Sequence, residues 1–159
     1  MTFDLSPHLL GLGPLPARWK HPWTRGLTLR MCFVKLILSG DKDLEIRHMS
    51  CVTMLNETVA LVPSGYFHVV GHVRIVDCFQ ITTLTRFNEL QGRHHFPGQH
   101  TALPYKNTWA WVLDNRCSYD YHLPVNKPSG AQLWVILTKP GVMNKEDWGR
   151  VGRSTIVPN

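Results

Sequence analysis

The chain lacks any hydrophobic run long enough to cross a membrane. A membrane-spanning helix needs roughly 18 or more consecutive apolar residues, and no such run occurs among the 159 residues. The apolar stretch at residues 9–15 is broken by glycine and proline, so it also lacks the hydrophobic core of a secretory signal. These absences predict an intracellular protein, in the cytoplasm, the nucleus or an organelle, with no membrane partner.

Paired metal-binding cysteines are also missing. Cys32, Cys51, Cys78 and Cys117 are widely spaced and form no Cys-x-x-Cys pair, which excludes the common zinc knuckles. An even number of cysteines is compatible with two disulfides, but Cys32 and Cys78 lie in apolar segments, as is typical of buried free thiols. We expect free thiols, no metal and no cofactor.

Acidic residues are few, 11 against 17 lysines and arginines, so the net charge is +6 and the pI is about 9.4. A basic balance favours polyanionic partners, and nucleic acid first. Several enzyme motifs are absent as well: the Gly-rich phosphate loop, a Ser-His-Asp set and the zinc signature of deaminases. The sequence therefore favours an RNA or other nucleic-acid partner over these enzyme classes.

The composition supports one globular domain, because 43% of the residues are hydrophobic and 18% are charged. Four prolines and two glycines predict an irregular N-terminal arm at residues 1–25. Residues 26–138 are predicted to form the folded domain, and residues 139–159 a basic C-terminal tail.

Hydrophobic patterning predicts an α+β, mainly β fold, a small mixed barrel with short helices. The expected strands cover residues 27–30, 43–47, 58–62, 66–81, 109–113, 119–123 and 132–138. The expected helices cover residues 32–38 and 83–91. Gly71, in the middle of the longest strand, predicts a bulge or a close backbone approach.

The segment Gly40-Asp41-Lys42-Asp43-Leu44-Glu45-Ile46-Arg47 places a polar cluster beside a glycine turn. A left-handed glycine can end the preceding helix, and alternation then puts Glu45 and Arg47 on one strand face. The charged ends of Lys42 and Arg47 are expected near solvent, where they can bind a phosphate or a base edge. The alternative is a salt-bridge network that only closes the barrel.

Two tryptophans two residues apart, Trp109 and Trp111, share a strand face. They are predicted to form a stacking platform for a base, or alternatively to fill the core. Asn115 and Arg116 follow and would add hydrogen-bonding groups to the same site.

The stretch from residue 92 to residue 106 is expected to be a basic loop, and it carries Arg93, His94, His95 and His100. We predict that Arg93 and His94 contact RNA, although a merely solvated loop is an alternative. A metal is not expected there, because no carboxylate or thiol neighbours the histidines.

Taken together, these segments resemble the ASCH domain, a member of the PUA-like superfamily. Residues 27–40, the motif ending at Arg47, the strand at 71–78, the tryptophan strand at 109–115 and the ending at 124–134 follow the order seen in that family. One departure is Cys32-Phe33, where many members have Pro-Tyr. The resemblance spans residues 26–138 and implies a small PUA-like β-barrel with two or three short helices.

The resemblance also implies RNA binding or a hydrolase that acts on RNA or a modified nucleoside. ASCH-type amidohydrolases use a lysine, a threonine nucleophile and a glutamate. Lys42 matches the lysine, Glu45 stands where the threonine is expected, and Glu89 is the nearest candidate for the glutamate. A carboxylate cannot replace an alcohol nucleophile, so the departure at Glu45 argues against amidohydrolase chemistry.

Three hypotheses follow. The first is an RNA-binding module that recognises a single-stranded or modified base in a cleft at the glycine turn. The second is a ribonuclease or amidohydrolase. The third is a structural component of a ribonucleoprotein, docked on RNA or protein through its arm and tail.

Overall fold

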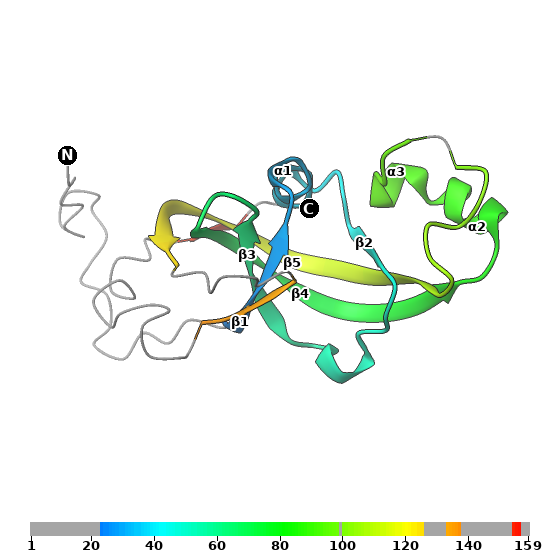
Figure 1. Ribbon diagram of the computed structural model, residues 1–159. Coiled ribbons are helices and arrows are strands. Elements are labelled where there is room, and N and C mark those ends of the chain that lie inside the picture. Colours follow the sequence, from blue (N-terminus) through cyan, green and yellow to red (C-terminus); the bar gives the residue numbers. More distant parts are fainter. Residues whose placement is uncertain (1–22, 99, 126–132, 138–153, 157–159) are drawn as a thin grey trace, which may run out of the picture.

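The computed structural model describes residues 23–98, 100–125, 133–137 and 154–156. Seven strands of the described residues form one sheet. The sheet curls into a half-barrel (Figure 1). This confirms the predicted α+β, mainly β fold. Residues 1–22 of the expected arm and residues 139–153 and 157–159 of the expected tail lie outside the described part.

The helices are short and the strands unequal. The helices are α1 (Met31–Ser39), α2 (Leu84–Glu89) and α3 (Gln91–His94), with a 3-10 turn at Val52–Met54. The strands are β1 (Trp23–Leu29), β2 (Leu44–Arg47), β3 (Thr58–Pro63), β4 (His68–Ile81), β5 (Thr108–Pro124), β6 (Trp134–Ile136) and β7 (Ser154–Ile156). Their order in the sheet is β2-β5-β4-β3-β1-β6, and β7 also pairs with β5. Strands β1 and β3 pair in parallel, and the other described pairs are antiparallel.

The long hairpin-like pair β4 and β5 gives the sheet its curl. The two strands expected at 109–113 and 119–123 are one strand, interrupted at Asn115 by a left-handed residue (φ 49°) and a register shift. A second shift lies beside Gly71, where an added Cβ would come within 2.4 Å of the Cys117 carbonyl oxygen. Such bulges bend a strand and increase its twist, so the prediction for Gly71 is confirmed.

Two of the expected boundaries differ in the structure. Strand β1 begins at Trp23, within the segment expected to be an arm, because this tryptophan is buried in the core. The helix expected at 83–91 divides at Leu90 into α2 and α3, so α3 takes up the start of the expected loop. Both short helices lie beyond the ends of β4 and β5 (Figure 1).

The core that supports the site lies between α1 and the concave face of the sheet. Val34 and Ile37 of α1 pack with Leu27, Val73 and Trp111 of the sheet, all of them buried. A neighbouring cluster joins Leu44 and Ile46 of β2 to the apolar face of α2. Among the described residues, no helix has the length and apolar character needed to cross a membrane.

Candidate ligand-binding site

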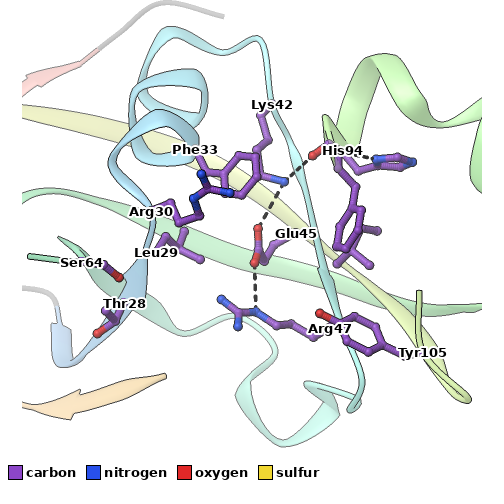
Figure 2. A pocket seen from close by; sticks show the side chains of 12 residues that line it. Thr28, Leu29, Arg30, Phe33, Lys42, Glu45, Arg47, Ser64, His94 and Tyr105 are labelled. Atoms are coloured by element: carbon purple, nitrogen blue, oxygen red, sulfur yellow. Dashed lines mark hydrogen bonds and ion pairs between the residues drawn. The ribbon is translucent and has the colours of Figure 1, made fainter. Parts of the chain in front are cut away.

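A cavity of about 210 Å³ opens where the end of β1, the start of α1, strand β2 and the segment after α3 meet. Figure 2 shows Lys42 and Arg47 directed toward the Glu45 carboxylate, with Arg30 beside the Phe33 ring. The residues that define its chemistry are Arg30, Phe33, Lys42, Glu45, Arg47 and Tyr105.

Lys42 is positioned by the end of α1. Gly40 takes a left-handed conformation (φ 89°) and ends the helix as predicted, and the Lys42 amide donates to the Leu36 carbonyl oxygen over 3.0 Å. The chain is folded back at this point, so the Lys42 side chain runs inward and the residue is only 3% exposed. The expectation that its charged end lies near solvent is therefore wrong.

The Lys42 ammonium group is satisfied internally. It donates to the carbonyl oxygens of Leu44 (2.5 Å) and His94 (2.6 Å) and forms an ion pair with Glu45 at 3.2 Å. These three acceptors match the three donors of an ammonium group. Burial lowers the pKa of Lys42 below its ordinary 10.5, and the Glu45 carboxylate partly offsets this effect. Lys42 is thus a buried cation that ties β2 to α3.

Glu45 links the buried cation to a more accessible one. Its side chain is 8% exposed; one carboxylate oxygen faces Lys42, and the other lies 2.9 Å from Nε of Arg47. Both contacts are ion pairs with cationic side chains. Glu45 consequently holds the Arg47 guanidinium in a fixed direction.

Arg47 and Arg30 leave the site with excess positive charge. Arg47 uses Nε for Glu45, and its terminal nitrogens point away from that carboxylate (Figure 2). Arg30 is exposed, and its guanidinium carbon lies 5.8 Å from the centroid of the Phe33 ring. Within the described residues, neither Arg30 nor the terminal nitrogens of Arg47 meet an acidic group. A ligand with negative charge or acceptor atoms is therefore favoured.

Several residues of the wall were not predicted from sequence. Arg30 immediately precedes α1, so a strand-to-helix junction is the signal that could have found it. Tyr105 reaches the cavity from the segment before β5, and its hydroxyl end faces Arg47 (Figure 2). Thr28 and Ser64 add hydroxyl groups, and the Thr28 hydroxyl is buried without a hydrogen-bond partner among the described residues.

His94 and Arg93 support the site from behind. His94 lines the cavity, but its side chain is fully buried and stacks on Phe87, so this burial does not support the predicted contact with RNA. Its role is structural, because its carbonyl oxygen accepts from Lys42. Arg93 is exposed but is held by Asp43 through hydrogen bonds of 2.9 Å, and this pair fastens α3 to the start of β2.

The two tryptophans do share the strand face that carries the site, but neither lines the cavity. In the pairing of β2 with β5, Trp111 is opposite Glu45 and Trp109 is opposite Arg47. Trp111 has no exposed surface, donates to the Met49 carbonyl oxygen over 2.9 Å and stacks on Trp134. The stacking-platform prediction is therefore wrong for Trp111, because the curled sheet encloses it. Trp109 is half-buried against the same core.

Other predicted residues lie outside the cavity. Arg116 packs against the Gly40 turn, where an added Cβ would come within 2.6 Å of the guanidinium. Asn115 is exposed at the bulge of β5. Glu89 is exposed on α2 and pairs with Arg86 at 3.5 Å, so it is not placed to act with Lys42. Within the described ranges, no three potential metal ligands come together.

We expect the protein to lose stability as the pH falls below about 6.5. Burial lowers the pKa of His94, His72 and His122 below their ordinary 6.5. In His94, Nδ1 also accepts from the Phe96 amide, a bond that protonation removes. Protons therefore bind preferentially to the unfolded chain, and folding stability decreases with acidification through this window.

Urea unfolding at about pH 7.5 and pH 5.5 measures this loss. His94→Gln should reduce the difference between the two pH values, whereas replacement of the exposed His48 by Gln should leave it unchanged. Equal stability at both pH values would contradict the prediction.

The comparisons with known proteins concern the fold. No family model and no curated protein matches this chain. The crystal structure of ASCH from Zymomonas mobilis superimposes with a TM-score of 0.55 at 15% identity, over 82% of this chain and 95% of that one. A serine-to-alanine mutant of the Zymomonas mobilis protein gives a TM-score of 0.56 at 16% identity, over 78% and 90%. The chain therefore has an ASCH-like fold.

Proposed function

We propose that this protein is an RNA-binding module whose cavity takes one unstacked nucleotide of single-stranded RNA. The observation that carries the proposal is the fixed Lys42–Glu45–Arg47 cluster beside Arg30, which meets no acidic group among the described residues. Three cationic side chains (Arg30, Lys42 and Arg47) and one carboxylate (Glu45) line the cavity, so the site is positive even after its internal ion pairs are counted. RNA offers both phosphate charge and base acceptors to such a site.

The size of the cavity favours a single small unit. Its volume of about 210 Å³ is below the roughly 300–1,000 Å³ of pockets that hold drug-sized ligands. Sequence-specific RNA binding commonly uses single bases that leave the stack and enter such pockets. One base, modified or unmodified, therefore fits the proposal better than a folded helix or a long peptide.

Within this cavity we assign ligand contact to Arg47, Arg30 and Tyr105. Arg47 is oriented by Glu45 at 2.9 Å, so little side-chain entropy is lost when its terminal nitrogens bind a phosphate or a base edge. Tyr105 is half-buried and can stack on a base, the role first expected of the tryptophans. Lys42 contributes by fixing Glu45 and through its charge.

The hydrolase alternative is less well supported by this geometry. The ammonium group of Lys42 has three acceptors, and Glu45 is committed to two cations. A general base or nucleophile needs a free lone pair within reach of the substrate. A role in a ribonucleoprotein would depend on the arm and tail, most of which lies outside the described residues.

The protein is expected to bind single-stranded RNA with an affinity that decreases between about 50 and 200 mM salt, because phosphate contacts release counterions. Arg47→Ala should weaken binding by about 10- to 100-fold, which corresponds to the roughly 1.5–3 kcal/mol of hydrogen bonds to a charged group. Fluorescence anisotropy with a labelled oligonucleotide provides the measurement.

Arg86→Ala is the matched control for Arg47→Ala. Arg86 is also paired with a glutamate, but it lies on the exposed surface of α2. The Arg86→Ala variant should lose only the RNA affinity that one unit of net charge contributes. No binding by folded protein at the lower salt, or equal losses in the two variants, would sink the proposal.

A further inference from the structure

Two cysteines that are 27 residues apart meet beside the sheet. The Cys51 amide donates to the sulfur of Cys78 over 3.1 Å, and the sulfur of Cys51 lies 3.9 Å from the carbonyl oxygen of Asp77, the residue before Cys78. The Ser50 hydroxyl lies 3.6 Å from the same Cys78 sulfur. These contacts place both thiols at the junction of β4 with the segment between β2 and β3.

The two thiols have different environments. Cys78 is half-buried on β4, whereas Cys51 is fully buried at the start of the 3-10 turn. The sulfur of Cys78 accepts a hydrogen bond from the Cys51 backbone amide. Burial, and then the hydrogen bond with the Cys78 side chain, raise the pKa of the Cys51 thiol well above its usual range. Cys78 is therefore the less buried of the two residues, and Cys51 stays protonated beside it.

The other two cysteines have no such arrangement. Cys32 is exposed on α1, and Cys117 is buried in β5. In the part of the chain that the structure describes, neither contacts a second thiol. In an oxidation experiment, Cys32 therefore serves as the reference for an exposed thiol without a neighbouring thiol, and Cys117 as the reference for a buried one.

We propose that Cys78 and Cys51 form a peroxide-reactive dithiol, in which Cys78 reacts first and Cys51 closes an intramolecular disulfide. The Cys78 sulfur attacks one oxygen of hydrogen peroxide; the O–O bond breaks, the sulfur is oxidised to a sulfenic acid, and the leaving hydroxide takes up the proton that the Cys78 thiol gives up, which forms the first water. The Cys51 sulfur then attacks Cys78, the S–O bond breaks, and water leaves with the Cys51 proton. Two thiols and one hydrogen peroxide thus give one disulfide and two waters.

The disulfide would fasten the segment after β2 to β4. This segment already touches the site region: the Met49 carbonyl oxygen accepts from Trp111, and the His48 ring meets Tyr105 edge-on at a centroid distance of 5.9 Å. Formation of the disulfide does not depend on whether the cavity binds RNA.

Hydrogen peroxide added to the reduced, folded full chain tests the proposal. After acid quenching, alkylation and peptide mapping, both thiols should be lost together in one linked peptide pair, and dithiothreitol should restore them. Cys51→Ser should prevent the link and leave Cys78 as a sulfenic acid that dimedone traps. Cys32→Ser should leave the link unchanged.

The wild-type protein alone can overturn the proposal. If Cys32 is oxidised while Cys51 and Cys78 both remain open to alkylation after unfolding, exposure decides reactivity and the pair has no special chemistry. A link that forms only in denatured protein would also overturn it. If Cys51→Ser fails to fold, Cys51→Ala replaces it in the trapping experiment.

Discussion

Replacement of Glu45 by glutamine is expected to destabilise the fold by about 3–5 kcal/mol. The side chain keeps its shape but loses the charge that compensates Lys42, whose side chain is 2% exposed. Breaking a buried ion pair by removing one partner leaves an unpaired charge in a low-dielectric environment. Thermal or urea unfolding at neutral pH measures the loss.

A second prediction for the Glu45→Gln variant concerns the pH dependence of its stability. Loss of the carboxylate that opposes the effect of burial should lower the pKa of Lys42 further in the folded state. The unfolded chain then binds the proton more tightly, so stability should rise with pH up to the ordinary value of 10.5. The destabilisation should therefore be smaller at alkaline pH.

Glu89→Gln is the control for Glu45→Gln, because Glu89 forms an ion pair whose two side chains are more than half exposed. Exposed pairs of this kind contribute little, so this variant should unfold almost like the unmodified protein. The double variant Lys42→Met with Glu45→Gln should recover part of the loss, since no buried charge remains unpaired. Equal stability of Glu45→Gln and Glu89→Gln would show that the Lys42–Glu45 pair is not buried in solution.

Trp111→Ala is expected to cost about 3–5 kcal/mol of stability, the range for removal of a buried large aromatic side chain. Trp111 has no exposed surface and packs against Trp134, with ring centroids 5.9 Å apart. It also donates from Nε1 to the Met49 carbonyl oxygen, which would be left without this partner. Urea unfolding followed by circular dichroism measures the effect.

Trp111→Phe separates packing from hydrogen bonding. It keeps most of the apolar volume and should lose only part of the stability, on the order of 1–3 kcal/mol for an unsatisfied buried acceptor and a smaller ring. RNA affinity per folded molecule should be unchanged in this variant, because Trp111 does not reach the cavity. A specific loss of affinity with unchanged stability would restore Trp111 as a stacking residue.

Local patterns in the sequence predicted the elements around the site. A glycine followed by alternating residues placed a helix end at Gly40 and put Glu45 and Arg47 on one face of the next strand. Both features depend on neighbouring residues in the chain, namely a left-handed helix end and the two-residue repeat of a strand. The same repeat predicted that Trp109 and Trp111 share a face, and the pairing of β2 with β5 shows that this is the face of Glu45.

The two-residue alternation of a strand does not determine how deeply one of its faces is buried once the sheet curls. The bulge at Asn115 and the close approach at Gly71 bend β4 and β5, and the resulting concave surface encloses Trp111 completely. The turn after α1 similarly directs Lys42 inward, where it meets the carbonyl oxygen of His94, a helical residue 52 positions later. These outcomes depend on long-range contacts, so the sequence could not distinguish a surface cluster from a buried one.

By itself, the sequence determined the basic charge, the mainly β elements and the ion-pair cluster, because each follows from composition or from residues close together in the chain. Only the tertiary structure decided that Arg30 and Tyr105 join Arg47 around one cavity, and that Cys51 lies against Cys78. Those groups come from separate elements. They meet because strand pairing and core packing fix where segments distant in sequence cross.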